Sequence, residues 1–137
     1  MSKVYEFEVK GKPQAKQRPR FGKYGKVYTP TQTSSYENWI KLCFINQYPT
    51  FKALEGAIDI RIVIFKEIPK STSKIKKAEM LKNIIKPTKK PDIDNIVKSV
   101  FDGLNKIAYK DGSQICSLSV EKIYSEEECV KIQIFEY

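Results

Sequence analysis

The stretch AIDIRIVIF, residues 57–65, carries the strongest β-strand pattern in the chain. Every second residue from Ile58 to Ile64 is isoleucine, so one face is uniformly apolar, and Val63 and Phe65 make the other face partly apolar. A strand that is apolar on both faces is typical of the middle of a sheet. We therefore expect residues 57–65 to form a central strand.

The elements before and after this strand alternate between strand and helix patterns. Residues 4–11, VYEFEVKG, alternate apolar and charged side chains and predict a half-buried strand. Helical spacing predicts a helix over residues 33–48, which should bury Trp39, and an exposed lysine-rich helix over residues 71–85.

The C-terminal part contains two strand patterns, ICSLSVEKIY and CVKIQIFEY, joined by the acidic link SEEE. We expect them to pair as a β-hairpin. The order of elements predicts an α/β (α+β) fold with one mixed β-sheet and helices packed on it. A chain of 137 residues fits one domain, so residues 1–137 are expected to form a single domain.

Composition restricts the function classes. The chain contains no histidine, which excludes Ser-His and Cys-His triads and histidine-containing zinc sites. The three cysteines, Cys43, Cys116 and Cys129, are too far apart for a CxxC pair and are expected to be buried free thiols. Because no secretory signal or apolar run of roughly 20 residues is present, we expect a cytoplasmic protein without membrane association.

The formal net charge of +9 favours a polyanionic partner. Positive charge is concentrated in residues 11–30, a sequence with three prolines that predicts a long loop, and in residues 66–90. Lys16, Arg18 and Arg20 in the first segment are our candidates for contacts with the phosphates of such a partner.

Acidic residues nevertheless occur in front of a strongly amphipathic helix, in PDIDNIVKSVFDGLN, residues 91–105. Asp92 and Asp94 flank its start, and Lys98 follows Asp94 by one turn. Two ordinary explanations stay open: an aspartate can cap the helix, and Asp94 with Lys98 can be a surface ion pair. The sequence DG at Asp111 is also a frequent turn signal.

A magnesium site explains why these residue types occur together. Phosphodiester hydrolysis without histidine can use carboxylates that hold Mg²⁺, and the ion then activates water and compensates charge on the leaving oxygen. A lysine behind the carboxylates can hold the scissile phosphate. A bound cation would also reconcile acidic residues with a basic, DNA-binding surface.

With its following turn, IAYKDGSQI, this segment resembles the signature of the RusA-like Holliday junction resolvases, a DxDNxxK helix followed by a DDxQ-type turn. GKPQAKQRPRF, VYTP and TSSYENW are similar to the phage and prophage branch of that family. The resemblance implies a homodimeric endonuclease that uses Mg²⁺, with Mn²⁺ as a substitute, to place symmetric nicks in four-way DNA junctions during recombination and repair. By matching positions, Asp92 and Asp94 would be metal ligands and Lys98 the catalytic lysine.

The third acid departs from the family pattern. An alignment on Gln114 puts Gly112 where the family has its usual third metal ligand, so Asp111 is expected to replace it, with Asp102 as a fallback. Two other functions stay open: a junction-binding protein with weak or no nuclease activity, and an RNA-binding module in which aromatic side chains of the basic loop stack on bases.

Overall fold

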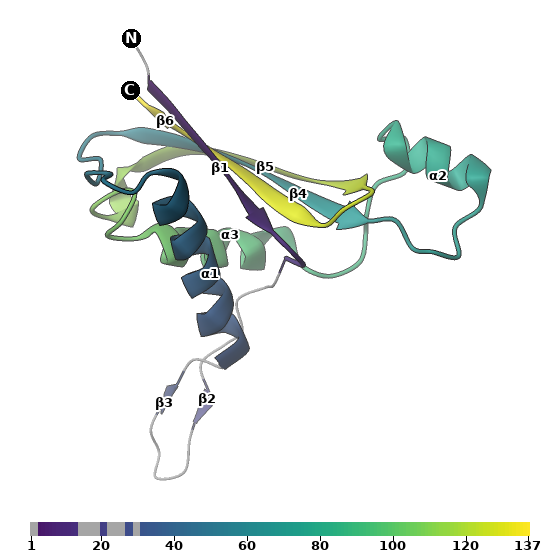
Figure 1. Ribbon diagram of the computed structural model, residues 1–137, viewed down its shortest axis with the longest axis horizontal. Helices are drawn as coiled ribbons and strands as arrows, with labels where there is room; N and C mark the ends of the chain where they lie inside the picture. The colour runs from purple at the N-terminus through teal and green to yellow at the C-terminus, as the bar shows by residue number, and fades with distance from the viewer. Residues whose placement is uncertain (1–2, 14–19, 22–26, 29–30) are drawn as a thin grey trace.

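The computed structural model describes residues 3–13, 20–21, 27–28 and 31–137. The elements are β1 Lys3–Lys10, β2 Arg20–Phe21, β3 Val27–Tyr28, α1 Thr31–Gln47, β4 Ile58–Glu67, α2 Lys74–Leu81, α3 Ile93–Leu104, β5 Ile115–Ser125 and β6 Cys129–Glu136. Four strands form the main sheet in the order β1-β6-β4-β5, and α1 and α3 cover one of its faces (Figure 1).

The prediction of a central strand at residues 57–65 is confirmed. β4 lies between β6, to which it is antiparallel, and β5, to which it is parallel. Its alternating isoleucines from Ile58 to Ile64 are all buried under the two helices. The predicted α+β class, a mixed sheet with helices packed on it, is therefore confirmed.

The predicted C-terminal hairpin is wrong. β5 pairs with β4 and not with β6, and β6 lies between β1 and β4. The chain enters β5 from β4 by way of α3, which is the long connection that parallel neighbours require. Because β4 pairs with a strand on each side, it separates the two C-terminal strands and leaves β5 at the edge of the sheet.

The predicted burial of Trp39 is also wrong. Tyr36, Ile40 and Phe44 recur at helical spacing and form the buried stripe of α1. Trp39 lies beside that stripe with 45% of its surface exposed, and its indole Nε1 donates a hydrogen bond of 2.9 Å to the backbone oxygen of Lys10. The ring thus covers the edge of β1 instead of filling the core.

Helices α1 and α3 approach each other closely at Gly103. A Cβ atom at this position would lie 2.9 Å from the backbone oxygen of Glu37 and 3.0 Å from Cβ of Ile40. On the same helix, Ile96 and Val100 are fully buried against the sheet. A small residue at position 103 therefore fixes how α3, and the residues at its start, sit on the sheet.

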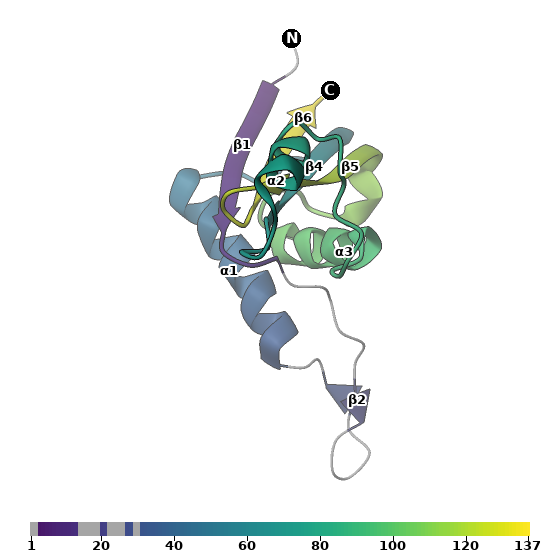
Figure 2. The same ribbon diagram turned by 90° about the vertical axis from the view of Figure 1, so that its right-hand side faces the viewer.

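Other expectations are partly met. Helix α2 is exposed as predicted but shorter, and it buries no residue. It lies beyond the end of the sheet in Figure 1, and in Figure 2, which faces that end, it stands in front of the sheet. All three cysteines are free, but Cys116 is exposed, so its predicted burial is wrong. β2 and β3 form a short ladder within the predicted loop of residues 11–30. No helix among the described residues is long and apolar enough to cross a membrane.

Candidate metal centre at helix α3

The two aspartates of the DxD sequence lie at the start of α3. Asp92 is the N-cap residue, with an extended backbone, and Asp94 lies in the first turn. Both side chains are exposed, as is Lys98 one turn later. Asp92 makes no side-chain capping hydrogen bond, and the ion pairs of the described residues do not include Asp94 with Lys98. The ordinary explanations, a capping carboxylate and a surface ion pair, thus find no support in these contacts.

A lysine of β5 holds the segment that leads into these carboxylates. The ammonium of Lys122 donates hydrogen bonds to the backbone oxygens of Lys89, at 2.8 Å, and Pro91, at 3.1 Å. Lys122 stands opposite Ile64 in the ladder, on the face that is otherwise apolar. Lys122 was not among the predicted site residues, although a lysine at an apolar position of the alternating pattern was a signal in the sequence. Asp92 is therefore positioned by the sheet as well as by its own helix.

The turn at Asp111 closes on itself as a capping box. One carboxylate oxygen of Asp111 accepts hydrogen bonds from the backbone N–H of Ser113, at 3.1 Å, and from the Ser113 hydroxyl. These donors, the hydroxyl first, lower the pKa of Asp111 below its ordinary value, because they stabilise the charged form. The turn signal at Asp111 is thus borne out, and this carboxylate already has a structural partner.

Gln114 anchors the same turn to the segment just before β4. Its side-chain oxygen accepts a hydrogen bond of 2.8 Å from the backbone N–H of Asp111, and its Nε2 donates to the backbone oxygens of Leu54, at 2.8 Å, and Gly56, at 2.9 Å. The amide therefore uses both donors and its acceptor to hold residues 111–114 beside the entry to β4.

The two groups of acids lie at opposite ends of α3. Asp92 and Asp94 stand at its start. Asp111 lies with Asp102 at its end, where the negative charge of both carboxylates helps to raise the pKa of the buried Tyr109. A helix of 12 residues is about 18 Å long. Ligand oxygens of one Mg²⁺ lie about 2.1 Å from the ion, so one chain does not bring these acids to one ion. Accordingly, no group of three potential metal ligands occurs within the part of the chain that the structure describes.

The position that departs from the family pattern has room for a side chain. Gly112 is exposed, and a Cβ atom built on it would meet nothing within 4 Å. Its backbone does not adopt the left-handed conformation that favours glycine. Neither packing nor backbone geometry therefore requires glycine here.

The predicted DNA contacts fall largely outside the described residues. Lys16 and Arg18 are not described, and Arg20 is described only as the first residue of β2. Among the described lysines, Lys89 and Lys90 are exposed immediately before the DxD sequence. Positive charge therefore adjoins the carboxylates along the chain.

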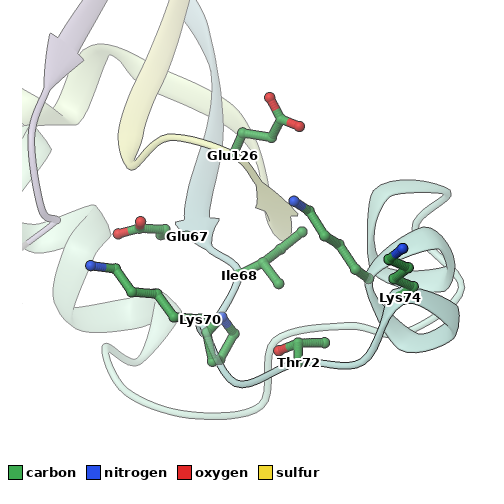
Figure 3. Close-up of a pocket in the computed structure, with 8 residues that line it drawn as sticks. Glu67, Ile68, Lys70, Thr72, Lys74 and Glu126 are labelled. Atoms are coloured by element: carbon green, nitrogen blue, oxygen red, sulfur yellow. The ribbon is translucent and has the colours of Figure 1, made fainter.

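A separate pocket of about 610 Å³ lies between the end of β4 and α2 (Figure 3). Glu67 and Lys70 line it from the β4 side, Lys74 from α2, and Glu126 from the connection between β5 and β6. Its lining includes none of the predicted site residues. Lys77 of α2 also lines it, so three lysines and two glutamates face the same space.

A protein family and one curated protein are similar to this chain over nearly its whole length. The family model for "Endodeoxyribonuclease RusA" matches residues 10–135. The chain is also similar to the uncharacterized protein YqaN of Bacillus subtilis (strain 168), with 38% identity over 136 residues that cover 96% of this chain and 95% of the relative. Both matches extend over α3, the turn at residues 111–114 and most or all of the basic loop.

Proposed function

Since this chain belongs to the RusA family of endodeoxyribonucleases, we propose that it is a Mg²⁺-dependent nuclease that resolves four-way DNA junctions by paired symmetric nicks. The family supports a nuclease that acts on DNA; the metal ion, the junction and the pairing of the nicks are our proposal. The observation that carries it is the pair of exposed aspartates at the start of α3, which lack a structural partner among the described residues.

The donor set at the start of α3 fits a hard divalent cation. Asp92 and Asp94 offer carboxylate oxygens, which Mg²⁺ prefers, and their exposure leaves room for the waters that the ion retains. When bound, the ion would activate water as the nucleophile and neutralise developing charge. Mn²⁺, with the same preference for oxygen, would be a substitute.

Lys98 supplies the complementary charge. Its ammonium lies one helical turn after Asp94 and is exposed, so it is free to contact a phosphate of bound DNA. A cation at this place holds the scissile phosphate and stabilises negative charge that develops on it. The exposed Lys89 and Lys90, together with Lys16, Arg18 and Arg20, would bind the DNA backbone without reading sequence.

We propose that the acid from the turn at residues 111–114 is supplied by a second copy of the chain. Asp111 lies near the end of α3, a helix about 18 Å long, whereas the DxD aspartates lie at its start, and the described residues hold no group of three possible metal ligands. Two symmetric nicks also call for two active sites, and two-fold dimers are the commonest oligomers. We therefore propose a homodimer in which Asp111 of one copy completes the metal set of the other.

One observation favours the alternative of a junction-binding protein that cuts slowly. The carboxylate of Asp111 accepts hydrogen bonds from Ser113, and Gly112 has no carboxylate to replace it. Both hydrogen bonds end on the same oxygen of Asp111, so the capping box leaves the other oxygen for an ion and fixes the direction in which it points. If that direction misses the ion, binding without efficient cutting would follow.

The test compares nicking of a synthetic four-way junction in Mg²⁺ by the wild type, Asp94→Asn and the control Asp59→Asn, with junction binding followed separately in Ca²⁺. Asp59 lies on β4, where it pairs with Arg61, away from α3. We expect the wild type and Asp59→Asn to place paired nicks, and Asp94→Asn to bind the junction but not to cut it. Nicking by Asp94→Asn at the wild-type rate would refute the assignment of the site. Binding without cutting by the wild type would favour the alternative.

A further inference from the structure

The segment that joins β4 to α3 carries most of the excess positive charge of the chain. Residues 70–90 contain eight lysines, no arginine and one acidic residue, Glu79, so they account for +7 of the formal net charge of +9. The eight lysines are all exposed: Lys70, Lys74, Lys76, Lys77, Lys82, Lys86, Lys89 and Lys90. Such an excess of one sign on a short segment is typical of a surface that binds a polyanion.

These eight lysines make no ion pair with any residue that the structure describes. Lysines elsewhere on the surface do pair with carboxylates. Lys66 lies 2.9 Å from Glu128, and Lys131 lies 3.7 Å from Glu8. The ordinary explanation of a charged helix is a solvated face that carries its own ion pairs, and residues 70–90 do not fit it.

Helix α2 forms locally and contributes nothing to the core. Ser73 caps its start, because the side chain accepts a hydrogen bond of 3.3 Å from the backbone N–H of Lys76. No residue of α2 is buried, and the helix lies beyond the end of the sheet (Figure 1). A helix of eight residues is only marginally stable in water by itself. Packing in the core therefore does not account for α2, whereas contact with a partner would.

The lysines of this segment fall into two groups. Lys70, Lys74 and Lys77 line the pocket between α2 and the sheet, together with Glu67 and Glu126 (Figure 3). The two carboxylates disfavour a phosphate inside this pocket. The other five lysines do not line it and follow one another along the chain toward the DxD sequence; we call them the lysine track: Lys76, Lys82, Lys86, Lys89 and Lys90.

The lysine track ends at the candidate metal centre. Lys122 fixes this end, since its ammonium donates a hydrogen bond of 2.8 Å to the backbone oxygen of Lys89 while the Lys89 side chain stays exposed. Lys122 lies near the end of β5, and α2 lies beyond the same end of the sheet (Figure 1). Asp92 follows Lys82 by ten positions, which span at most about 35 Å, the length of about 10 base pairs.

We propose that the lysine track binds the phosphate backbone of a duplex arm of the DNA junction, within about 10 base pairs of the nicked phosphate. The inference rests on the proposed function, because it takes the start of α3 as the place of the nick. The track would add a second contact with the substrate, remote from the metal ion and independent of base sequence.

The side chains of the segment favour duplex DNA over other anionic partners. Residues 70–90 contain no aromatic side chain, on which the bases of a single strand would stack. Ile75 and Leu81 are exposed, but their spacing of six residues puts them about 120° apart around α2. They form no single apolar stripe of the kind that inserts into a membrane surface or a protein groove.

The experiment measures binding to a synthetic four-way junction in Ca²⁺, by fluorescence anisotropy over a range of KCl concentrations. It compares the wild type, the α2 variant Lys76→Gln/Lys82→Gln and the control Lys3→Gln/Lys52→Gln, which removes the same charge from exposed lysines of β1 and of the α1–β4 connection. Each phosphate contact contributes about 0.9 to the slope of log affinity against log salt. We expect the slope of the α2 variant to fall by about 1.8 for each copy bound, and its affinity at about 0.1 M KCl to fall by about tenfold or more. Equal slopes for the α2 variant and the control would overturn the inference.

A second measurement locates the contact on the DNA. Methylphosphonates replace about 10 phosphates of each arm next to the branch point and remove their charge. The wild type should bind this junction more weakly, whereas the α2 variant should lose little further affinity, because two changes to one contact are not additive. Additive losses would refute a direct contact. Vesicles with phosphatidylglycerol test the other occupant: an α2 variant that loses vesicle binding but keeps wild-type junction binding would overturn the inference.

Nicking by the wild type in Mg²⁺ is followed on the same unmodified junction. A reduced salt slope in the α2 variant, without nicking by the wild type, leaves the lysine track standing and refutes the proposed function. Paired nicks by the wild type, with equal salt slopes for the α2 variant and the control, do the reverse.

Discussion

Replacement of Gln114 by alanine should destabilise the fold through the turn that carries Asp111. The amide of Gln114 makes three hydrogen bonds of 2.8 to 2.9 Å, one of them partly buried and two exposed. A hydrogen bond contributes about 0.5–1.5 kcal/mol net, and less where water can replace the partner. The backbone oxygens of Leu54 and Gly56 lose a donor together. We expect the free energy of unfolding to fall by about 2 kcal/mol in Gln114→Ala.

Urea denaturation followed by circular dichroism measures this change. With a denaturant dependence of about 2 kcal/mol per molar, a loss of about 2 kcal/mol lowers the midpoint by about 1 M. Gln47→Ala is the matched control, because Gln47 is exposed at the end of α1 and its side chain makes no hydrogen bond to another described residue. If the two variants have the same midpoint, or Gln114→Ala shifts it by less than about 0.3 M, the anchoring role of Gln114 is refuted.

Three further predictions concern α3 and the turn after it. Gly103→Ala should lower the free energy of unfolding by about 1–2 kcal/mol, although alanine has the better helix propensity, because the added Cβ would lie 2.9 Å from the backbone oxygen of Glu37. The control Gly56→Ala, whose Cβ meets nothing within 4 Å, should leave the free energy of unfolding unchanged, and equal urea midpoints for the two variants would contradict the prediction. Burial raises the pKa of Tyr109, and the nearby carboxylates of Asp102 and Asp111 raise it further, so the phenol should stay protonated in the folded state above pH ~10. The unfolded chain ionises first, so the free energy of unfolding should fall as the pH rises above that value. Phenolate absorbance and unfolding at alkaline pH measure both effects, and an ordinary titration of Tyr109 in the folded protein would disprove the prediction. Gly112→Asp should raise the nicking rate at limiting Mg²⁺ by about tenfold or more without loss of stability, and an unchanged rate would show that position 112 does not reach the metal site.

The local elements of this protein could be derived from the sequence because their signals are local. Alternation along residues 57–65 identified the central strand, and the apolar spacing in residues 91–105 identified α3 with its aspartates in front. The motif at Asp92 and Asp94 also pointed to the family that the comparisons support. Each of these signals lies within one helix or one strand, where the period of the side chains decides the backbone conformation.

Strand order could not be derived in this way. The alternating patterns of β5 and β6 are the same whether the two strands pair with each other or with β4. The choice depends on which neighbour buries more apolar surface, and that is a comparison between segments far apart in the chain. Position along the sequence therefore favoured a hairpin, whereas in the structure β4, which is apolar on both faces, lies between β5 and β6.

The relation between the candidate site residues was decided only by the tertiary structure. Spacing along the chain shows that Asp111 follows the DxD aspartates, but only the packed helix shows that they stand at its two ends. Likewise, the hold of Lys122 on Pro91 joins residues 31 positions apart. The sequence determined which side chains can bind metal and DNA, because that depends on their chemistry; the fold decided which of them can act together in one chain, because that depends on distance.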